Sequence, residues 1–290
     1  MHQNKLALFC ACFLGINLFC TPIASAQKIT SPVSQENYSS QELLQNLTKA
    51  NVVYLGETHT SEADHKAQLE IIQKVYAKKS KIAIAMEMFQ RPYQKAIDLY
   101  LAGKITEEEL LTQTEYQQRW GFPWEYYAPI LRFAKENRIP VLALNTPTEI
   151  TRKVSSQGLE SLTAEDKKYI PPISEIRTDN AGYRQMLSEI FNQHQKDGHG
   201  SSTGFERFFS AQVLWDETMA ESIAEFVKAN PNHTVIVLAG QGHLVYGYGI
   251  PSRVARRLGN RLVQKTILLN FDADLPVNKD QPIADFLWSD

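Results

Sequence analysis

The sequence predicts an α/β fold in which helices flank a mostly parallel central sheet. Three observations predict it. Short runs rich in Val, Ile and Leu are almost continuously apolar, which is typical of strands covered on both faces. Segments with apolar residues at helical spacing alternate with these runs. The 290 residues are 43% hydrophobic and 21% charged, which is ordinary for a globular protein with a sizeable core.

The chain begins with a predicted secretory signal peptide over residues 1–26. Lys5 provides a positive start, residues 6–20 are apolar, and Ala-Ser-Ala at 24–26 matches the small-x-small pattern of a cleavage site. The apolar run is too short for a comfortable membrane span. We therefore expect cleavage directly after this pattern, export to the periplasm or cell envelope, and a single α/β domain over residues 27–290.

A lipid anchor on Cys20 is the alternative for the same segment. Phe19 precedes this cysteine, where a lipoprotein signal needs a small residue, so simple cleavage is favoured. All three cysteines of the chain, Cys10, Cys12 and Cys20, lie before the predicted cleavage site. Cleavage removes disulfides, thiolate catalysis and cysteine-bound metals from consideration. It also removes Lys5, which changes the formal charge from −2 to −3, and no basic stripe predicts a nucleic-acid partner.

Five apolar runs are the predicted strands, and the gaps between them are uneven. One helix separates the first two strands, whereas about 90 residues separate the third strand from the fourth. Because so long a gap exceeds a connector, we expect a mostly helical insertion over about 146–232. Within it, residues 194–204 lack periodicity and predict a mobile loop. The predicted strands are 51–57, 81–88, 139–145, 233–240 and 263–271.

The predicted helices combine helical spacing with recognisable ends. Thr106 and Glu109 form a capping box at the start of one helix. The last helix begins with Pro251 and ends with Gly259, which is the preferred placement of both residue types. The predicted helices are 61–79, 106–118, 124–137, 205–230 and 251–259.

Polar residues follow four of the five predicted strands. Glu57 and His59 follow the first strand, Glu87 ends the second, Asn145 ends the third, and His243 follows the fourth. In an open parallel sheet, ligands bind beyond the carboxyl ends of the strands. We therefore expect these side chains to lie close together at one edge of the sheet. Glu87 lies within an apolar strand, where a carboxylate costs several kcal/mol unless it is paired.

The types of these residues limit the chemistry that they can perform. Two histidines and two carboxylates can hold a divalent metal such as zinc or manganese, which lowers the pKa of a bound water. Without a metal, the same set suits general acid–base hydrolysis. The structural alternative is that Glu57 and His59 cap the following helix, where an acid contributes roughly 0.3–1 kcal/mol. Four further histidines are predicted to be solvated or in loops: His65, His194, His199 and His233.

The glycine-rich stretch 240–253 is the second unusual feature. Tyr246 and Tyr248 alternate there with Gly247 and Gly249. A phenol on such a segment is either a packed aromatic or an axial ligand for ferric haem. The backbone freedom that glycine gives would let the ring meet a flat ligand.

Two more segments have alternative interpretations. The helix 205–230 places Gln212 and Asp216 four residues apart, where they either face the cleft or pair on the helix surface. The segment 119–127 contains five aromatic residues, which form either a porphyrin wall or part of the core. These residues are Trp120, Phe122, Trp124, Tyr126 and Tyr127.

Motifs in a fixed order resemble those of the ChaN-type haem-binding proteins of bacterial iron uptake. They are VYLGETH, AMEMFQRPYQ, LALNTP, SAQVLWDETMA and LAGQGHLVYGYGIPSRVARR, and they span roughly residues 40–271. These proteins belong to a wider superfamily with Tiki metalloproteases and erythromycin esterases. The resemblance implies an α/β core with a helical insertion, a cell-envelope location, and haem bound between two subunits with tyrosine as an iron ligand.

The resemblance also implies where the site lies. The motifs place Glu57, His59, Glu87 and His243 on the superfamily's site positions. For the iron-coordinating tyrosine, Tyr248 is the first choice and Tyr246 the second, with His243 and His59 as further cofactor contacts. Two functions stay open. One is an exported haem-binding protein that acts as a homodimer with envelope haem-uptake components. The other is a metal-dependent hydrolase or peptidase of the Tiki or erythromycin esterase type.

Overall fold

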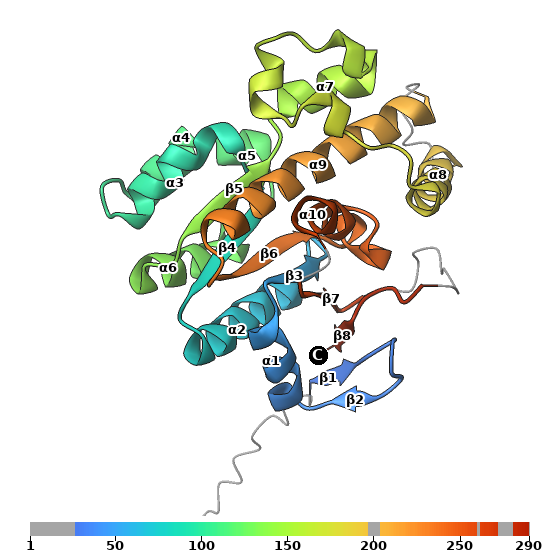
Figure 1. The fold of residues 1–290 in the computed structure, drawn as a ribbon. Helices are drawn as coiled ribbons and strands as arrows, with labels where there is room; N and C mark the ends of the chain where they lie inside the picture. The colour runs from blue at the N-terminus through green and yellow to red at the C-terminus, as the bar shows by residue number, and fades with distance from the viewer. Residues whose placement is uncertain (1–26, 197–203, 260–261, 272–280, 290) are drawn as a thin grey trace, which may run out of the picture.

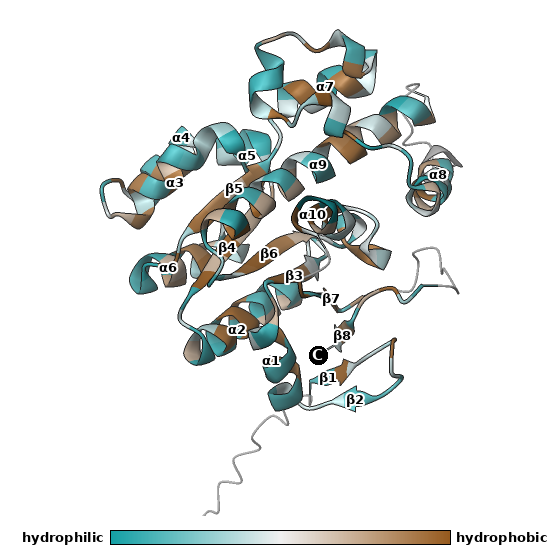
Figure 2. Cartoon of the chain, in the orientation of Figure 1, coloured by the Kyte–Doolittle hydropathy of each residue, from teal (hydrophilic) through white to brown (hydrophobic). Residues whose placement is uncertain are grey.

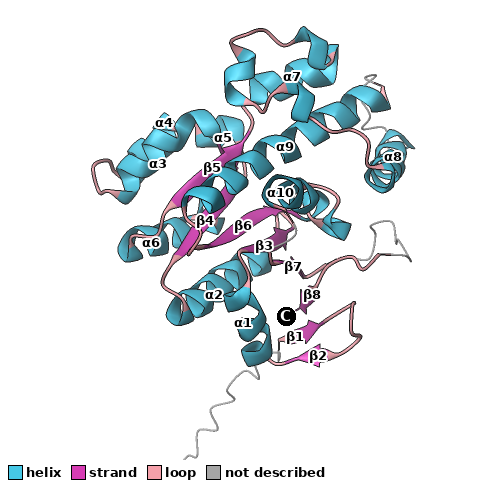
Figure 3. Ribbon diagram, in the orientation of Figure 1, coloured by secondary structure: helices cyan, strands magenta, loops and turns pink. Residues whose placement is uncertain are grey.

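The computed structural model describes residues 27–196, 204–259, 262–271 and 281–289. These residues form an α/β fold around an eight-stranded sheet of order β2-β1-β8-β7-β3-β6-β4-β5, which confirms the predicted fold class (Figure 3). Neighbouring strands from β8 to β5 run parallel, and only the β1–β2 end is antiparallel. The predicted signal peptide, with Cys20, and most of the predicted loop 194–204 lie outside the described residues.

All five predicted strands are present. They are β3 (Val52–Glu57), β4 (Ile82–Gln90), β5 (Val141–Asn145), β6 (Thr234–Gly240) and β7 (Gln264–Leu269). Three further strands are only two to four residues long, which is too short for a periodic pattern to show. They are β1 (Lys28–Thr30), β2 (Asn37–Tyr38) and β8 (Phe286–Ser289).

Both faces of the central strands are apolar because helices cover both faces. In β3, Val53 and Leu55 pack into one core, whereas Val52 and Tyr54 pack into a second core on the opposite face. This alternation follows from the two-residue period of a strand. Figure 2 shows the resulting hydrophobic band along the strands. It explains why the sequence lacks the polar–apolar alternation of a half-exposed sheet.

Six helices pack against the first core, and four pack against the second. The first group is α1 (Ser40–Lys49), α2 (Glu62–Lys78), α3 (Gln94–Leu101), α4 (Glu107–Gln113), α5 (Tyr116–Arg119) and α6 (Ala128–Asn137). The second is α7 (Thr148–Gln157), α8 (Ala181–Lys196), α9 (Phe205–Ala229) and α10 (Ile250–Leu258). Figure 1 shows α9 and α10 side by side. None of the helices in the described ranges has the length and apolarity needed to span a membrane.

Two predicted helices differ from the observed ones. The predicted helix 106–118 is split into α4 and α5 at Glu115, which has a left-handed backbone with φ 49°. The predicted helix 124–137 begins with a 3₁₀ turn before α6 starts. Between β5 and β6 the described residues form α7, short 3₁₀ turns, α8 and α9. This segment corresponds to the mostly helical insertion that we predicted over about 146–232.

The sheet has a topological switch point between β3 and β6. These two strands are neighbours, and Glu57 at the end of β3 is paired with Gly240 at the end of β6. The chain leaves β3 through α2 on one face and leaves β6 through α10 on the other. Chains that diverge in this way leave a crevice beyond the carboxyl ends of the strands, which is where ligands bind in open α/β sheets.

Candidate functional site

The four predicted site residues meet at this crevice in two pairs. The His59 Nδ1 lies 2.9 Å from the Glu57 Oε1, and the His243 Nε2 lies 3.3 Å from the Glu87 Oε1. Both pairs border Gly240: its backbone N–H donates to Glu87 at 2.8 Å, and the His59 ring lies against its Cα. The structure therefore brings together, at the ends of three strands, side chains that are far apart in the sequence, as we predicted from the strand ends.

Glu57 is buried on the α2 and α6 side of the sheet and is held by several donors. Tyr127 donates its hydroxyl to Oε1 at 2.6 Å, and Gln68 donates its amide to Oε2 at 2.6 Å. The Nδ1 of His65 lies 3.5 Å from the same Oε2. Because a buried carboxylate is costly unless it is paired, these contacts fix Glu57 in the position that orients His59.

His65 was expected to be solvated, and the structure shows that this expectation is wrong. The residue is 3% exposed, and its ring stacks on Tyr126 and meets the edge of Tyr127. Its Nε2 lies 3.2 Å from the backbone oxygen of His59. The signal that could have revealed it is the spacing of His65, Gln68 and Ile72, which places all three on the buried face of α2.

His59 is the residue of this site that faces outward. Its side chain is 29% exposed, and its ring centroid lies 4.8 Å from that of Trp120 and 5.0 Å from that of Phe122. While Nδ1 contacts Glu57, Nε2 makes no hydrogen bond with the described part of the chain. Burial by itself lowers the pKa of His59, but the hydrogen bond to Glu57 and the charge of Glu87 outweigh it and raise that pKa.

Gly240 is required for this arrangement. A Cβ at this position would lie 2.9 Å from the Cε1 and 3.0 Å from the Nε2 of His59. Any other residue would therefore push the imidazole out of its place. The glycine thus leaves room for a ring at the end of β6, next to the Glu87 carboxylate.

Glu87 and His243 form a buried ion pair that continues to α9. The His243 Nδ1 lies 2.6 Å from the Asp216 Oδ1, so the imidazole has a carboxylate on each side. Tyr183 donates its hydroxyl to the other Asp216 oxygen at 2.6 Å. Burial opposes charge on both partners, but their mutual attraction prevails: it lowers the pKa of Glu87 to about 2 and helps raise that of His243 to about 10.

Gln212 and Asp216 face the site and do not pair on the helix surface. Gln212 has its Nε2 3.0 Å from the Nδ1 of His243, and Asp216 is fully buried beside the same imidazole. Asn145, the remaining strand-end residue, donates to the backbone oxygen of Glu87 at 3.0 Å and so ties the end of β5 to β4.

The predicted metal ligands are engaged with one another. Within the described ranges, no three or more His, Cys, Asp or Glu side chains are placed to hold a metal ion. The set Glu57, His59, Glu87 and His243 is arranged instead as two His–carboxylate pairs. A zinc or manganese ion at this site would have to replace hydrogen bonds that these side chains already make.

Tyr246 and Tyr248 pack inward. They are 3% and 8% exposed and belong to the core on the α9 face. The Tyr248 ring lies 5.4 Å from Tyr246, and its hydroxyl would be 2.7 Å from a Cβ at Gly182 in α8. Of the two alternatives for a phenol on this segment, the structure shows the packed one. The left-handed backbone falls on Tyr246 and Gly247, not on Tyr248.

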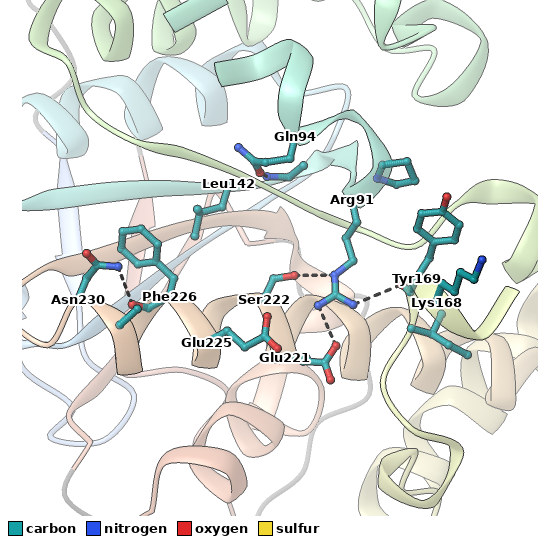
Figure 4. Close-up of a pocket in the computed structure, with 14 residues that line it drawn as sticks. Arg91, Gln94, Leu142, Lys168, Tyr169, Glu221, Ser222, Glu225, Phe226 and Asn230 are labelled. Carbon is teal, nitrogen blue, oxygen red and sulfur yellow. Dashed lines mark hydrogen bonds and ion pairs between the residues drawn. The ribbon is translucent and has the colours of Figure 1, made fainter. Parts of the chain in front are cut away.

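A separate hollow of about 550 Å³ lies at the outer edge of β5. Figure 4 shows it lined by Arg91, Leu142 and Phe226, among others, and none of its lining residues belongs to the histidine site. Arg91 is fully occupied there, because it bonds Ser222 and pairs with Glu221 at 2.8 Å each. This hollow is therefore not part of the histidine site.

Comparisons with known proteins find a family model and solved structures that this chain resembles. The model of the family described as haem-binding uptake, Tiki superfamily, ChaN matches residues 43–254. A solved structure of cofacial haem binding to ChaN of Campylobacter jejuni superposes with a TM-score of 0.69, at 18% identity, over 90% of this chain and 96% of that chain. An erythromycin esterase in its open conformation gives a TM-score of 0.48 at 14% identity, over 84% of this chain and 76% of that chain.

A curated plant protein also matches. Protein RETICULATA-RELATED 5, chloroplastic, of Arabidopsis thaliana is 27% identical over 259 residues, which are 83% of this chain and 34% of the plant protein. The chain therefore spans about a third of the length of the curated relative that it matches.

Proposed function

The chain belongs to the family described as haem-binding uptake, Tiki superfamily, ChaN, and on that premise we propose that it is an exported haem-binding protein that serves the uptake or handling of haem iron. The family match over residues 43–254 and the likeness to a ChaN fold support haem as the ligand. Export to the periplasm or cell envelope is supported by the sequence of residues 1–26.

The observation on which haem binding at this site rests is the environment of His59. Its Nδ1 contacts a buried carboxylate and its Nε2 is uncommitted, which is the usual arrangement of a metal-ligating histidine. Trp120 and Phe122 flank the ring and provide the apolar surface that a flat macrocycle needs. When bound, haem supplies an iron that takes a nitrogen or phenolate ligand.

The other predicted cofactor contacts are less available. His243 has a carboxylate at each ring nitrogen, and Tyr246 and Tyr248 are buried against α8 and α9. We therefore assign the contact with iron to His59, with Glu57 and Tyr127 as the residues that hold its ring in place. A tyrosine ligand from Tyr248 would require that α8 moves away from it.

The alternative is a hydrolase, and one observation favours it. The Glu57–His59 pair has the geometry of a general base, with the carboxylate holding Nδ1 and the open Nε2 able to accept a proton. His243 cannot be that base near neutral pH, because its pKa of about 10 keeps it protonated. The hydrolase alternative therefore depends on His59 as well.

A titration with hemin, followed by absorption spectroscopy, tests the proposal. We expect a saturable Soret band for the wild-type protein and at least tenfold weaker binding for His59→Gln, because the variant loses the nitrogen ligand. His233→Gln, in the turn before β6, is the matched control and should bind as the wild type does. Loss of the band in Tyr248→Phe alone would move the iron contact to Tyr248.

The titration also separates the two functions. A protein that gives no saturable Soret band but hydrolyses an ester, with activity lost in His59→Gln, would replace the haem proposal by the hydrolase alternative. We further propose that the haem-bound form is a homodimer that acts with envelope haem-uptake components. Sedimentation with and without hemin tests the dimer, and a monomer in both states would contradict it.

A further inference from the structure

A second groove, of about 460 Å³, lies on α9 and α10 and shares no lining residue with the histidine site. It is bordered by the last turns of both helices and by the segment around Arg177. Lys228 lies twelve residues after Asp216 on α9, which is about 18 Å along the helix. The groove is thus separate from the site that contacts haem in our proposal.

Two arginines that line this groove share a buried carboxylate, that of Glu217. Glu217 is fully buried, and its Oε2 lies 2.6 Å from both the Arg256 Nη2 and the Arg257 Nη1. A third guanidinium, that of Arg253, has its Nε 3.4 Å from the other Glu217 oxygen. Glu217 by itself does not balance these three charges, and the more distant acidic neighbours are Asp216, 4.0 Å from the Arg253 Nη1, and Glu175, 3.4 Å from the Arg257 Nη2.

The rim of the groove adds more positive charge. Arg177 and Lys228 are exposed there and form no side-chain ion pair with the described residues. Three glutamates also line the groove, but Glu221 is paired with Arg91, as Figure 4 shows. Without that pair, the lining charges are four positive ones, Arg177, Lys228, Arg256 and Arg257, against Glu175 and Glu225, and the adjoining buried Glu217 is a third negative charge.

Arg257 gives a second, independent indication that this groove binds an anion. Its side chain is only 8% exposed, yet its Nε and Nη2 make no hydrogen bond with the described part of the chain. Glu175 is 3.4 Å from that Nη2, close enough to attract it but without a hydrogen bond. Buried donors without an acceptor are costly and call for one.

Part of this cluster has a structural explanation. Arg256 and Arg257 lie in the last turn of α10, where positive charge is favoured by the helix dipole. Lys228 lies in the last turn of α9, where the same dipole applies, whereas Arg177 lies outside a helix and has no such role. The positive side chains also repel one another. Burial and the neighbouring arginines lower the pKa of Arg256, although the attraction of Glu217 opposes them.

We propose that this groove binds a small, multiply charged oxyanion through Arg177, Lys228, Arg256 and Arg257. The planar forks of the two α10 arginines suit carboxylate and phosphate oxygens, and Lys228 adds a mobile point charge. No aromatic side chain lines the groove within the described residues, so the ligand is polar throughout and is not a flat apolar molecule.

Calorimetric titrations with inorganic pyrophosphate and, separately, with citrate test this proposal at constant ionic strength. We expect the wild-type protein to bind at least one of them, and the choice between them shows whether phosphate or carboxylate groups are preferred. The double variant Arg177→Gln, Lys228→Gln should bind that anion at least tenfold more weakly. Both side chains are exposed, so the fold should be retained, which circular dichroism checks.

The matched control is Arg152→Gln, Lys95→Gln, which removes the same two charges from exposed positions on α7 and α3. It should bind as the wild type does. Absence of binding to both anions by the wild type would overturn the proposal. An equal loss in the control and in the groove variant would overturn it too, because the effect would then come from net charge alone.

Discussion

At the scale of single residues, the imidazole of His243 between two carboxylates sets the electrostatics of the site. Glu87 and Asp216 stabilise its protonated form, and Tyr183 donates its hydroxyl to Asp216. His59 differs because only one of its nitrogens is committed and its side chain is partly exposed. The geometry therefore distinguishes the two histidines: His243 is held between two carboxylates, and His59 is the one that we propose contacts the ligand.

This arrangement predicts how stability depends on pH. His243 has its pKa raised from 6.5 to about 10, so its contribution is fully present below pH 6.5 and is lost as pH rises through 10. Glu87 has its pKa lowered from 4.5 to about 2, so its contribution is present above pH 4.5 and is lost as pH falls through 2. Urea unfolding should show both contributions together between about pH 4.5 and 6.5, and a decline of a few kcal/mol towards pH 10.

Nuclear magnetic resonance of the histidine side chains tests directly whether the two carboxylates keep His243 protonated. The His243 ring should still be protonated at pH 8, and Asp216→Asn should lower its titration midpoint by at least about one pH unit, because one of its two carboxylates is lost. Asp98→Asn, an exposed position on α3, should leave the midpoint unchanged. A wild-type midpoint near the ordinary 6.5 would contradict the ion-paired His243.

At the scale of elements, the free edge of β5 is closed by one side chain. Gln94, the first residue of α3, donates to the backbone oxygen of Val141 at 2.8 Å and accepts from the N–H of Ala143 at 2.7 Å. Its amide thus replaces the neighbouring strand that β5 lacks at the end of the sheet. Open edges of this kind invite pairing with other chains, so the contact opposes aggregation.

Replacing Gln94 by alanine should expose this edge. We expect the free energy of unfolding to fall by about 1 kcal/mol, since two backbone groups lose their partner, and light scattering to show more self-association. Gln117→Ala, an exposed glutamine on α5, is the matched control. Equal stability and equal scattering for both variants would show that β5 does not need this protection.

The elements also show what the sequence could predict. The long strands β3, β4 and β6 were predictable because buried parallel strands are apolar on both faces. The split of helix 106–118 was not, because it depends on the left-handed backbone of Glu115, which no pattern of apolar residues reveals. Four helices, α1, α3, α7 and α8, were not predicted, although the capping box of Ser39 and Glu42 at the start of α1 is a signal that the sequence contains.

At the scale of the whole molecule, the topology brings the site together. Glu57, His59, Glu87 and His243 were predictable as a group, because the carboxyl ends of parallel strands share one edge. The residues that hold them were not: Tyr127 reaches Glu57 from the turn before α6, and His65 and Gln68 reach it from α2. Those contacts depend on how each helix packs on the sheet, which the sequence does not state locally.

Export is a property of the whole chain and has its own test. Because residues 1–26 have the charged start, apolar run and Ala-Ser-Ala ending of a signal peptide, we expect the exported protein to begin at Gln27. Mass spectrometry of the protein from the producing cells determines this first residue directly. A mature chain that begins at Cys20 with a diacylglyceryl mass would show that it is a lipoprotein instead.

The position of the iron in a crystal of the hemin complex tests the central claim most directly, because anomalous scattering locates iron without assumptions about its ligand. The account predicts the iron next to the His59 Nε2, with the macrocycle against Trp120 and Phe122 and with the Glu57 contact to Nδ1 retained. Iron bound to Tyr248 with α8 displaced, or bound away from the carboxyl ends of β3 and β6, would contradict it.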